Sequence, residues 1–138
     1  MINILVLCTG NSCRSQMAHG FLSKYTKGKA VVYSAGVETH GVNPMAINTM
    51  KEVNIDISHH TSNHIDEYQT IDFDFILTVC NNAKERCPFF PSNAQKFHRN
   101  FFDPSKVKGT PEEIEEAFRS ARNEIEHYCE KFAIEHIL

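Results

Sequence analysis

Residues 8–15 read Cys8-Thr9-Gly10-Asn11-Ser12-Cys13-Arg14-Ser15, and the rest of the chain can be placed from this segment. An apolar run at residues 2–7 leads into it. A helical pattern follows it, with apolar residues on one face at Met17, Phe21, Leu22 and Tyr25. The segment therefore joins a strand to the N-terminus of a helix. Unpaired backbone N–H groups and the positive end of the helix dipole favour an anion at such a position.

Cys8 and Arg14 have side chains that suit an anion site. A helix N-terminus and a guanidinium both stabilise a thiolate, so we expect Cys8 to ionise more readily than an ordinary thiol. Arg14 can hold a tetrahedral oxyanion through two parallel hydrogen bonds. Ser12 and Ser15 can donate hydroxyls to the thiolate or to the anion. The alternative is a buried cysteine at the end of a strand beside a surface arginine, but a structural cysteine does not need this setting.

The segment resembles the phosphate-binding loop of the low-molecular-weight protein tyrosine phosphatases. In that family the first cysteine is the nucleophile and the arginine binds the oxyanion, which implies these roles for Cys8 and Arg14. The resemblance implies that the whole loop lines an oxyanion site, with Thr9, Gly10, Asn11, Ser12, Cys13, Arg14 and Ser15. Asn11 tolerates a left-handed backbone and is expected to shape the loop. Cys13 is interpreted as a packed loop residue rather than a redox partner.

Length and composition favour one globular domain that spans residues 1–138. The chain is long enough for a real core, and 41% hydrophobic with 22% charged residues is typical of soluble proteins. A net charge of −3 without a basic block does not favour nucleic acid or an anionic membrane as a partner. We find neither an apolar run of membrane-spanning length nor a signal-peptide pattern, so we expect a cytoplasmic protein.

The cysteines are five: Cys8, Cys13, Cys80, Cys87 and Cys129. In a cytoplasmic chain of this size they favour catalytic, redox or metal-binding roles over a disulfide framework. The sequence has no Cys-x-x-Cys, and no histidine pair at zinc-ligand spacing near the cysteines, so we expect no metal site. The histidines at 59, 60 and 64 form the one local cluster and are interpreted as loop residues.

Strands and helices are expected to alternate along the rest of the chain. Further strands are predicted at 30–34, 73–79 and 94–98, and helices at 12–26, 44–53 and around 62–68. A long last helix should begin near Pro111, with Thr110 as its N-cap. Its apolar stripe comprises Ile114, Phe118, Ala121, Ile125, Tyr128 and Phe132, with Cys129 beside it as a core thiol. This alternation predicts an α/β fold with a four-stranded parallel sheet flanked by helices, of the flavodoxin-like type.

Such folds place their sites at the carboxyl ends of the strands. Cys8 follows the first strand, Cys80 follows the third, and Asp103 lies a few residues after the fourth. We therefore expect these three side chains at one edge of the sheet, although they are far apart in the sequence. Asp103 precedes Pro104, and the alternative for this pair is an ordinary turn.

Cys80 and Cys87 form a second feature. If residues 80–87 were helical, the two positions would lie roughly 10 Å apart along the axis. A disulfide needs Cα atoms within about 7 Å, so this bond would require the segment to unwind or loop back. The alternative is two unrelated thiols, one at a strand end and one in a loop.

The chain as a whole resembles the thioredoxin-coupled arsenate reductases, which share the phosphatase fold. The match rests on residues 8–18, on residues 33–44 with Tyr33-Ser34-Ala35-Gly36 and Thr39-His40-Gly41-Val42-Asn43-Pro44, on Cys80 to Cys87-Pro88, and on Asp103-Pro104. The resemblance implies a relay in which Cys8 attacks arsenate, Cys80 attacks the adduct, and Cys87 passes the disulfide to thioredoxin. It also implies that Asp103 is the general acid.

One functional detail departs from that family. Some members bind potassium through a glutamate and an aspartate, and the matching positions here are His19 and Asn63, beside Asn11 and Ser34. A hard cation prefers oxygen donors, so we expect weak or absent potassium activation and no tightly bound cofactor.

Two other functions remain open. One is a phosphatase that acts on phosphotyrosine or another phosphomonoester, with Phe89, Phe90 or Phe101 at its rim. The other is a thiol-based binding or regulatory protein that senses oxidants or metalloids. In each case we expect a monomer.

Overall fold

The computed structural model describes residues 1–81 and 88–138. Four parallel strands form one sheet in the order β2-β1-β3-β4. Their bounds are Ile2–Leu7 for β1, Ala30–Ala35 for β2, Phe75–Thr78 for β3 and Gln95–His98 for β4. This order is the flavodoxin-like one, and it confirms the predicted fold class.

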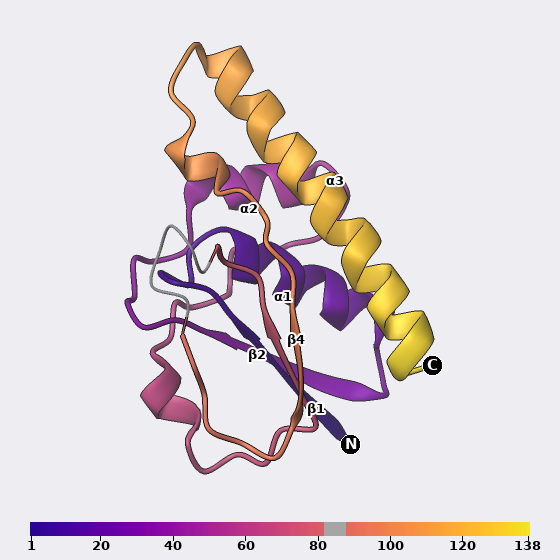
Figure 1. Cartoon of the computed structure of the whole chain (residues 1–138). Helices are drawn as coiled ribbons and strands as arrows, with labels where there is room; N and C mark the ends of the chain where they lie inside the picture. The colour runs from indigo at the N-terminus through magenta and orange to yellow at the C-terminus, as the bar shows by residue number, and fades with distance from the viewer. Residues whose placement is uncertain (82–87) are drawn as a thin grey trace.

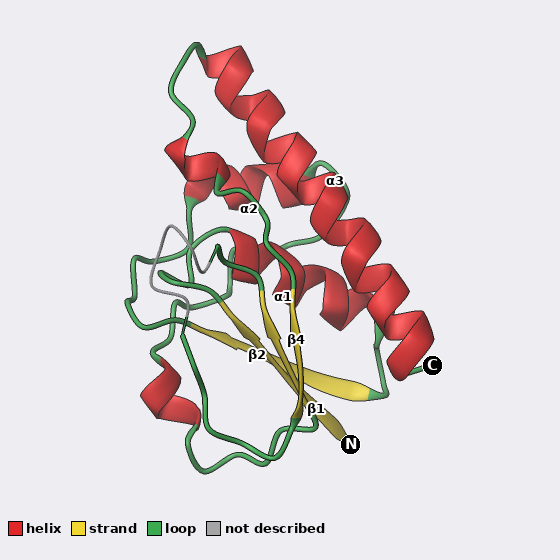
Figure 2. Cartoon of the chain, viewed as in Figure 1, coloured by secondary structure: helices red, strands yellow, loops and turns green. Residues whose placement is uncertain are grey.

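The helices are α1 (Arg14–Tyr25), α2 (Pro44–Lys51) and α3 (Pro111–His136), with short 3-10 helices η1 (Ile65–Tyr68) and η2 (Pro104–Lys106). Figure 1 shows α1, α2 and α3 together on one side of the sheet. The other side is covered by η1 and extended segments, as Figure 2 shows at the lower left. Both faces of the sheet are therefore covered, one by helices and the other largely by loops.

Strand β1 explains why the sheet needs both layers. Ile4 and Val6 pack in a core with α1 and α3, whereas Leu5 and Leu7 pack in a second core with Phe73. Alternate side chains of a strand point to opposite faces, and all four residues are fully buried. A strand that buries apolar side chains on both faces in this way is typical of the centre of a parallel sheet.

The element boundaries differ from the predictions by a few residues. Helix α1 begins at Arg14 rather than near residue 12, because residues 8–13 form the loop. Helix α2 ends at Lys51, two residues early, and Asn54 just beyond it has a left-handed φ of 64°. Strand β3 is shorter than the predicted residues 73–79 and covers only Phe75–Thr78.

Helix α3 begins as predicted. Thr110 accepts a hydrogen bond from the backbone of Glu113, and the Glu113 side chain accepts one from the Thr110 backbone. This reciprocal pair is a capping box, with Pro111 in the first turn. Among the described residues, no helix is both long and apolar enough to span a bilayer.

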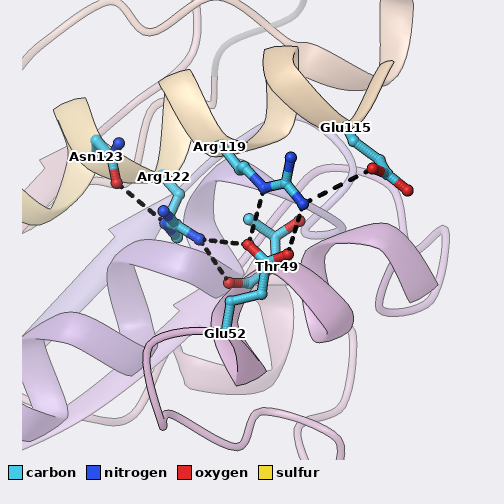
Figure 3. Close-up of polar contacts among 6 residues, drawn as sticks. All are labelled: Thr49, Glu52, Glu115, Arg119, Arg122 and Asn123. Atoms are coloured by element: carbon cyan, nitrogen blue, oxygen red, sulfur yellow. Dashed lines mark hydrogen bonds and ion pairs between the residues drawn. The ribbon is translucent and has the colours of Figure 1, made fainter. Parts of the chain in front are cut away.

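Helices α2 and α3 are joined by a cluster of polar side chains, shown in Figure 3. Glu52, at the end of α2, receives hydrogen bonds from Arg119 (2.8 and 3.0 Å) and Arg122 (2.8 Å). Arg122 also donates to the Thr49 carbonyl at 3.0 Å. Since Arg122 is 8% exposed, this contact fixes the two helices from inside the packed layer.

Candidate active site

Strands β1 and β3 end side by side. Leu7 pairs with Thr78, and the Val79 amide donates to the Leu7 carbonyl at 3.0 Å. The residues that follow, Cys8 and Cys80, therefore leave the sheet at the same edge. This edge is the switch point of the strand order, where flavodoxin-like folds bind ligands.

Of the two later cysteines, Cys80 lies within the described residues and Cys87 does not. Cys80 is fully buried and disulfide-bonded. Cys87 was predicted to take over a disulfide from Cys80, and it lies outside the described residues, which omit 82–87. Cys8, Cys13 and Cys129 are not disulfide-bonded.

The loop that begins at Cys8 is held by a second loop, residues 36–43. Backbone amides of Glu38, His40 and Asn43 donate to carbonyls of the first loop at 3.0–3.1 Å. Gly36 permits this approach, because a Cβ there would lie 2.5 Å from the Thr9 carbonyl oxygen. The two loops therefore form one rigid wall.

Asn11 turns the first loop. Its φ is 49°, in the left-handed region predicted for it, and the residue is fully buried. Its side chain accepts a hydrogen bond from the Asn63 amide at 2.7 Å and donates one to Ser15 Oγ at 2.8 Å. Ser15 was expected to donate to the anion. In the structure its hydroxyl oxygen also accepts the hydrogen bond from Asn11, which helps to hold the loop.

Arg14 is the first residue of α1 and is 3% exposed. Its Nη1 donates to the Phe101 carbonyl at 3.2 Å, and its Nη2 lies 3.5 Å from Asp103 Oδ2. Asp103 Oδ1 accepts hydrogen bonds from the Ser105 amide and hydroxyl at 3.0 and 2.6 Å. Asp103 is thus fixed as the N-cap of η2, with its other oxygen toward Arg14.

A cavity of about 640 Å³ opens in front of the loop. Cys8 and Arg14 line it from one side and Asp103 from the other. The other lining residues are Thr9, Gly10, Ser12, Cys13, Glu38, His40, Asn81, Phe101, Phe102, Ser105, Lys106 and Val107. Of the three aromatic residues expected at the rim, Phe101 lines this cavity, whereas Phe89 and Phe90 line a different one beside β3 and β4.

Cys13 is buried close to Cys8, yet it differs in chemistry. Burial, followed by the negative charge of Asp103, raises the pKa of Cys13 to about 12. Its side chain therefore stays a neutral thiol near pH 7, which suits a packed residue. Burial and the nearby charge of Glu126 likewise raise the pKa of Cys129, the thiol beside the α3 stripe.

Several contacts of the site were not predicted from the sequence. Glu38 and His40 form a pair at the cavity rim, with Glu38 Oε1 2.6 Å from His40 Nε2. His60, interpreted as a loop residue, packs against His19 with ring centroids 4.3 Å apart. Gln16 is fully buried. Its position as a polar residue on the inner face of an amphipathic helix was the one hint in the sequence that it has a role in the site. Among residues 1–81 and 88–138, no group of three or more metal-ligating side chains is placed to hold a metal ion.

A protein-family comparison matches residues 3–137 to the model described as low molecular weight phosphotyrosine protein phosphatase. The chain belongs to this family. The loop at residues 8–15, with Arg14, and the Asp103-Pro104 pair are parts of the chain on which the resemblance in sequence rested.

Relatives within this family are close to the chain over nearly all its length. The arsenate reductase of Halalkalibacterium halodurans is 49% identical over 130 residues, and 94% of each chain is covered. Arsenate reductase 1 of Staphylococcus epidermidis is 50% identical, and the arsenate reductase of Bacillus subtilis is 45% identical, with the same coverage.

Solved structures agree with this relationship. An arsenate reductase in the phosphate binding state has a TM-score of 0.79 and 31% identity, with 98% of each chain covered. An arginine phosphatase with a phosphorylated active-site serine has a TM-score of 0.77 at 21% identity, which shows a common fold.

Proposed function

We propose that this protein reduces arsenate to arsenite. The observation that carries the proposal is the position of Cys8 in a rigid anion loop, with Arg14 and Asp103 at the same cavity and Cys80 at the neighbouring strand end. Relatives named arsenate reductase, at 45–50% identity over most of the chain, support it. We further propose that the protein is active as a monomer.

In the first step the Cys8 thiolate attacks arsenic, because the thiolate is the nucleophilic form of cysteine. A sulfur–arsenic bond forms and an arsenic–oxygen bond breaks. Arg14 and the N–H groups at the start of α1 hold the oxyanion while charge develops. The departing oxygen takes a proton from Asp103, which acts as the general acid.

In the second step the Cys80 thiolate attacks the Cys8 sulfur of the adduct. A Cys8–Cys80 disulfide forms, and the electron pair of the sulfur–arsenic bond leaves with arsenic as arsenite. Cys87 then attacks Cys80, which frees Cys8, and the dithiol of thioredoxin reduces the last disulfide. The disulfide at Cys80 supports a redox role for this residue. We place this chemistry in the cytoplasm, where thiol reductants operate.

Two substitutions test the relay in the presence of thioredoxin, thioredoxin reductase and NADPH. Cys80→Ser should abolish sustained arsenite production, because the adduct cannot be resolved. Cys87→Ser should stop after a single turnover and accumulate a Cys8–Cys80 disulfide, which mass spectrometry of peptides would detect. If either variant keeps turning over arsenate with thioredoxin, the relay is wrong.

A second activity is favoured by the size of the cavity. A volume of about 640 Å³ with Phe101 and the exposed Phe102 in its lining leaves room for more than a small oxyanion. We therefore propose residual hydrolysis of aryl phosphates by Cys8, Arg14 and Asp103. Hydrolysis of para-nitrophenyl phosphate should survive Cys80→Ser and be lost in Cys8→Ser. Loss of hydrolysis in Cys80→Ser as well as in Cys8→Ser would contradict hydrolysis by Cys8, Arg14 and Asp103 alone.

Potassium does not fit the residues behind the loop. His19 Nδ1 lies 2.9 Å from Ser34 Oγ, and Asn11 Oδ1 already accepts the Asn63 amide. A ring nitrogen and oxygens already in hydrogen bonds form a poor donor set for a hard cation. We therefore propose that the enzyme works without potassium.

A further inference from the structure

Gln16 lies directly behind the anion loop, in the first turns of α1, and is fully buried. Its Nε2 donates to the Asn11 carbonyl at 3.1 Å and to the Thr61 carbonyl at 3.0 Å. Both amide hydrogens are therefore used. The side chain connects the left-handed residue of the loop to a second segment, residues 60–63.

Segment 60–63 forms the back wall of the loop. The Asn63 amide donates to Asn11 Oδ1 at 2.7 Å, and Ser62 Oγ donates to the Gly10 carbonyl at 3.1 Å. The contacts of Gln16 complete this wall on the side of α1. The position of Asn11 thus depends on how the Gln16 amide is oriented.

The Asn11 and Thr61 carbonyls select that orientation, and His60 supports it. Its Nδ1 lies 3.0 Å from Gln16 Oε1. An amide oxygen only accepts hydrogen bonds, so Nδ1 must carry the proton. The opposite amide orientation would direct Oε1 at two carbonyl oxygens, which also only accept. The contact therefore fixes the tautomer of His60 and the amide of Gln16 together.

The surroundings of His60 keep it neutral. Its ring packs against His19 in a tilted arrangement, with ring centroids 4.3 Å apart, and meets His59 edge-on at 4.8 Å. Burial, followed by the charge of His59 and opposed by that of Asp56, lowers the pKa of His60 to about 4. Burial, followed by the charges of His60 and His59, lowers the pKa of His19 to about 3. Above about pH 5 both rings are uncharged, so His60 acts as a donor through one defined nitrogen.

We propose that His60 is a positioning residue for the anion loop, acting through Gln16. Its Nδ1–H holds the Gln16 amide so that both amide hydrogens point at the Asn11 and Thr61 carbonyls, and this fixes the turn at Asn11. The proposal rests on the proposed function only in taking residues 8–14 as the anion loop. Inorganic phosphate is therefore a suitable probe, since its binding needs no reductase activity.

Long-range nitrogen–proton NMR on the 15N-labelled protein at pH 7 tests the tautomer directly. The signals of His60 are those missing from the spectrum of His60→Gln. We expect a protonated Nδ1 and a bare Nε2. A proton on Nε2, or an average of both tautomers, would overturn the proposal whatever the variants do.

Phosphate affinity tests the consequence. His60→Gln keeps an amide donor and should bind phosphate like the natural protein. His60→Leu has no donor and should bind about fivefold more weakly, the effect of losing a typical hydrogen bond. His59→Leu removes the exposed neighbouring ring and is the matched control, with affinity unchanged. Equal affinity in His60→Leu and the natural protein, or equal losses in His60→Gln and His60→Leu, would contradict a role for the donor.

The same proteins separate this proposal from the proposed function. If the natural protein does not reduce arsenate, the reductase assignment fails, while the order of phosphate affinities still decides the role of His60. If the protein reduces arsenate and the order of affinities is lost, only the role of His60 fails.

Discussion

At the scale of single residues, two cysteines of one loop are given different chemistry by their surroundings. Cys8 lines the cavity beside Arg14 at the carboxyl end of β1, whereas the pKa of Cys13 is raised to about 12 by burial and by Asp103. Because alkylation requires the thiolate, brief treatment of the reduced protein with iodoacetamide at pH 8 should label Cys8 and spare Cys13. Peptide mass spectrometry measures the two yields. The urea-unfolded protein, in which both should react, is the control, and equal labelling in the folded state would contradict the assignment.

At the scale of elements, the joint between α2 and α3 depends on Arg122 more than on Arg119. Arg122 is nearly buried and donates to both the Thr49 carbonyl and Glu52, whereas the Arg119 side chain is exposed. Losing charged hydrogen bonds inside the packed layer in Arg122→Ala should lower the free energy of unfolding by about 2 kcal/mol. Arg119→Ala is the matched control with a smaller loss, since exposed ion pairs contribute little. Urea unfolding measures both, and a larger loss for Arg119→Ala would contradict this ranking.

The same contacts between α2 and α3 predict how the stability of the protein depends on pH. Hydrogen bonds from Arg119, and then from Arg122, lower the pKa of Glu52 to about 2 from 4.5. A carboxylate with a lowered pKa in the folded state stabilises the protein above its unfolded pKa, and this contribution is lost as the pH falls toward 2. Glu52→Gln should therefore show a shallower loss of stability between about pH 4.5 and 2. A profile parallel to that of the natural protein would mean that Glu52 is not coupled to folding.

At the scale of the whole molecule, three elements meet behind the anion loop, at the place where some members of the resembling family bind potassium. Helix α1 supplies His19, β2 supplies Ser34, and the segment before η1 supplies Asn63. Since the pKa of His19 is lowered to about 3, mainly by burial, a neutral ring takes the place of a charged ligand there. Replacing sodium by potassium at constant ionic strength should leave kcat/KM for arsenate unchanged. A strong enhancement specific to potassium would show that the remaining oxygens suffice.

Much of this arrangement was predictable because its signals are local. Hydrophobic periodicity and one anion-binding pattern predict the strand at 2–7, the loop and the start of α1. Thr110 and Glu113 form the capping pattern that indicates the start of α3. The strand order then brings Cys8 and Cys80 to one edge. The support of the loop was not predictable, because Gln16 and His60 are 44 residues apart and their pairing depends on which side chains become buried.

The sequence alone predicted the parallel sheet and the loop that begins at Cys8. It also predicted that residues after separate strands share one edge of the sheet. Those features depend on neighbours along the chain and on the regular geometry of strands and helices. The tertiary structure alone decided that Arg14 meets Asp103, that burial raises the pKa of Cys13, and that Gln16 lies between His60 and the Asn11 carbonyl. Burial and hydrogen-bond partners set these properties, and both exist only after distant segments have packed together.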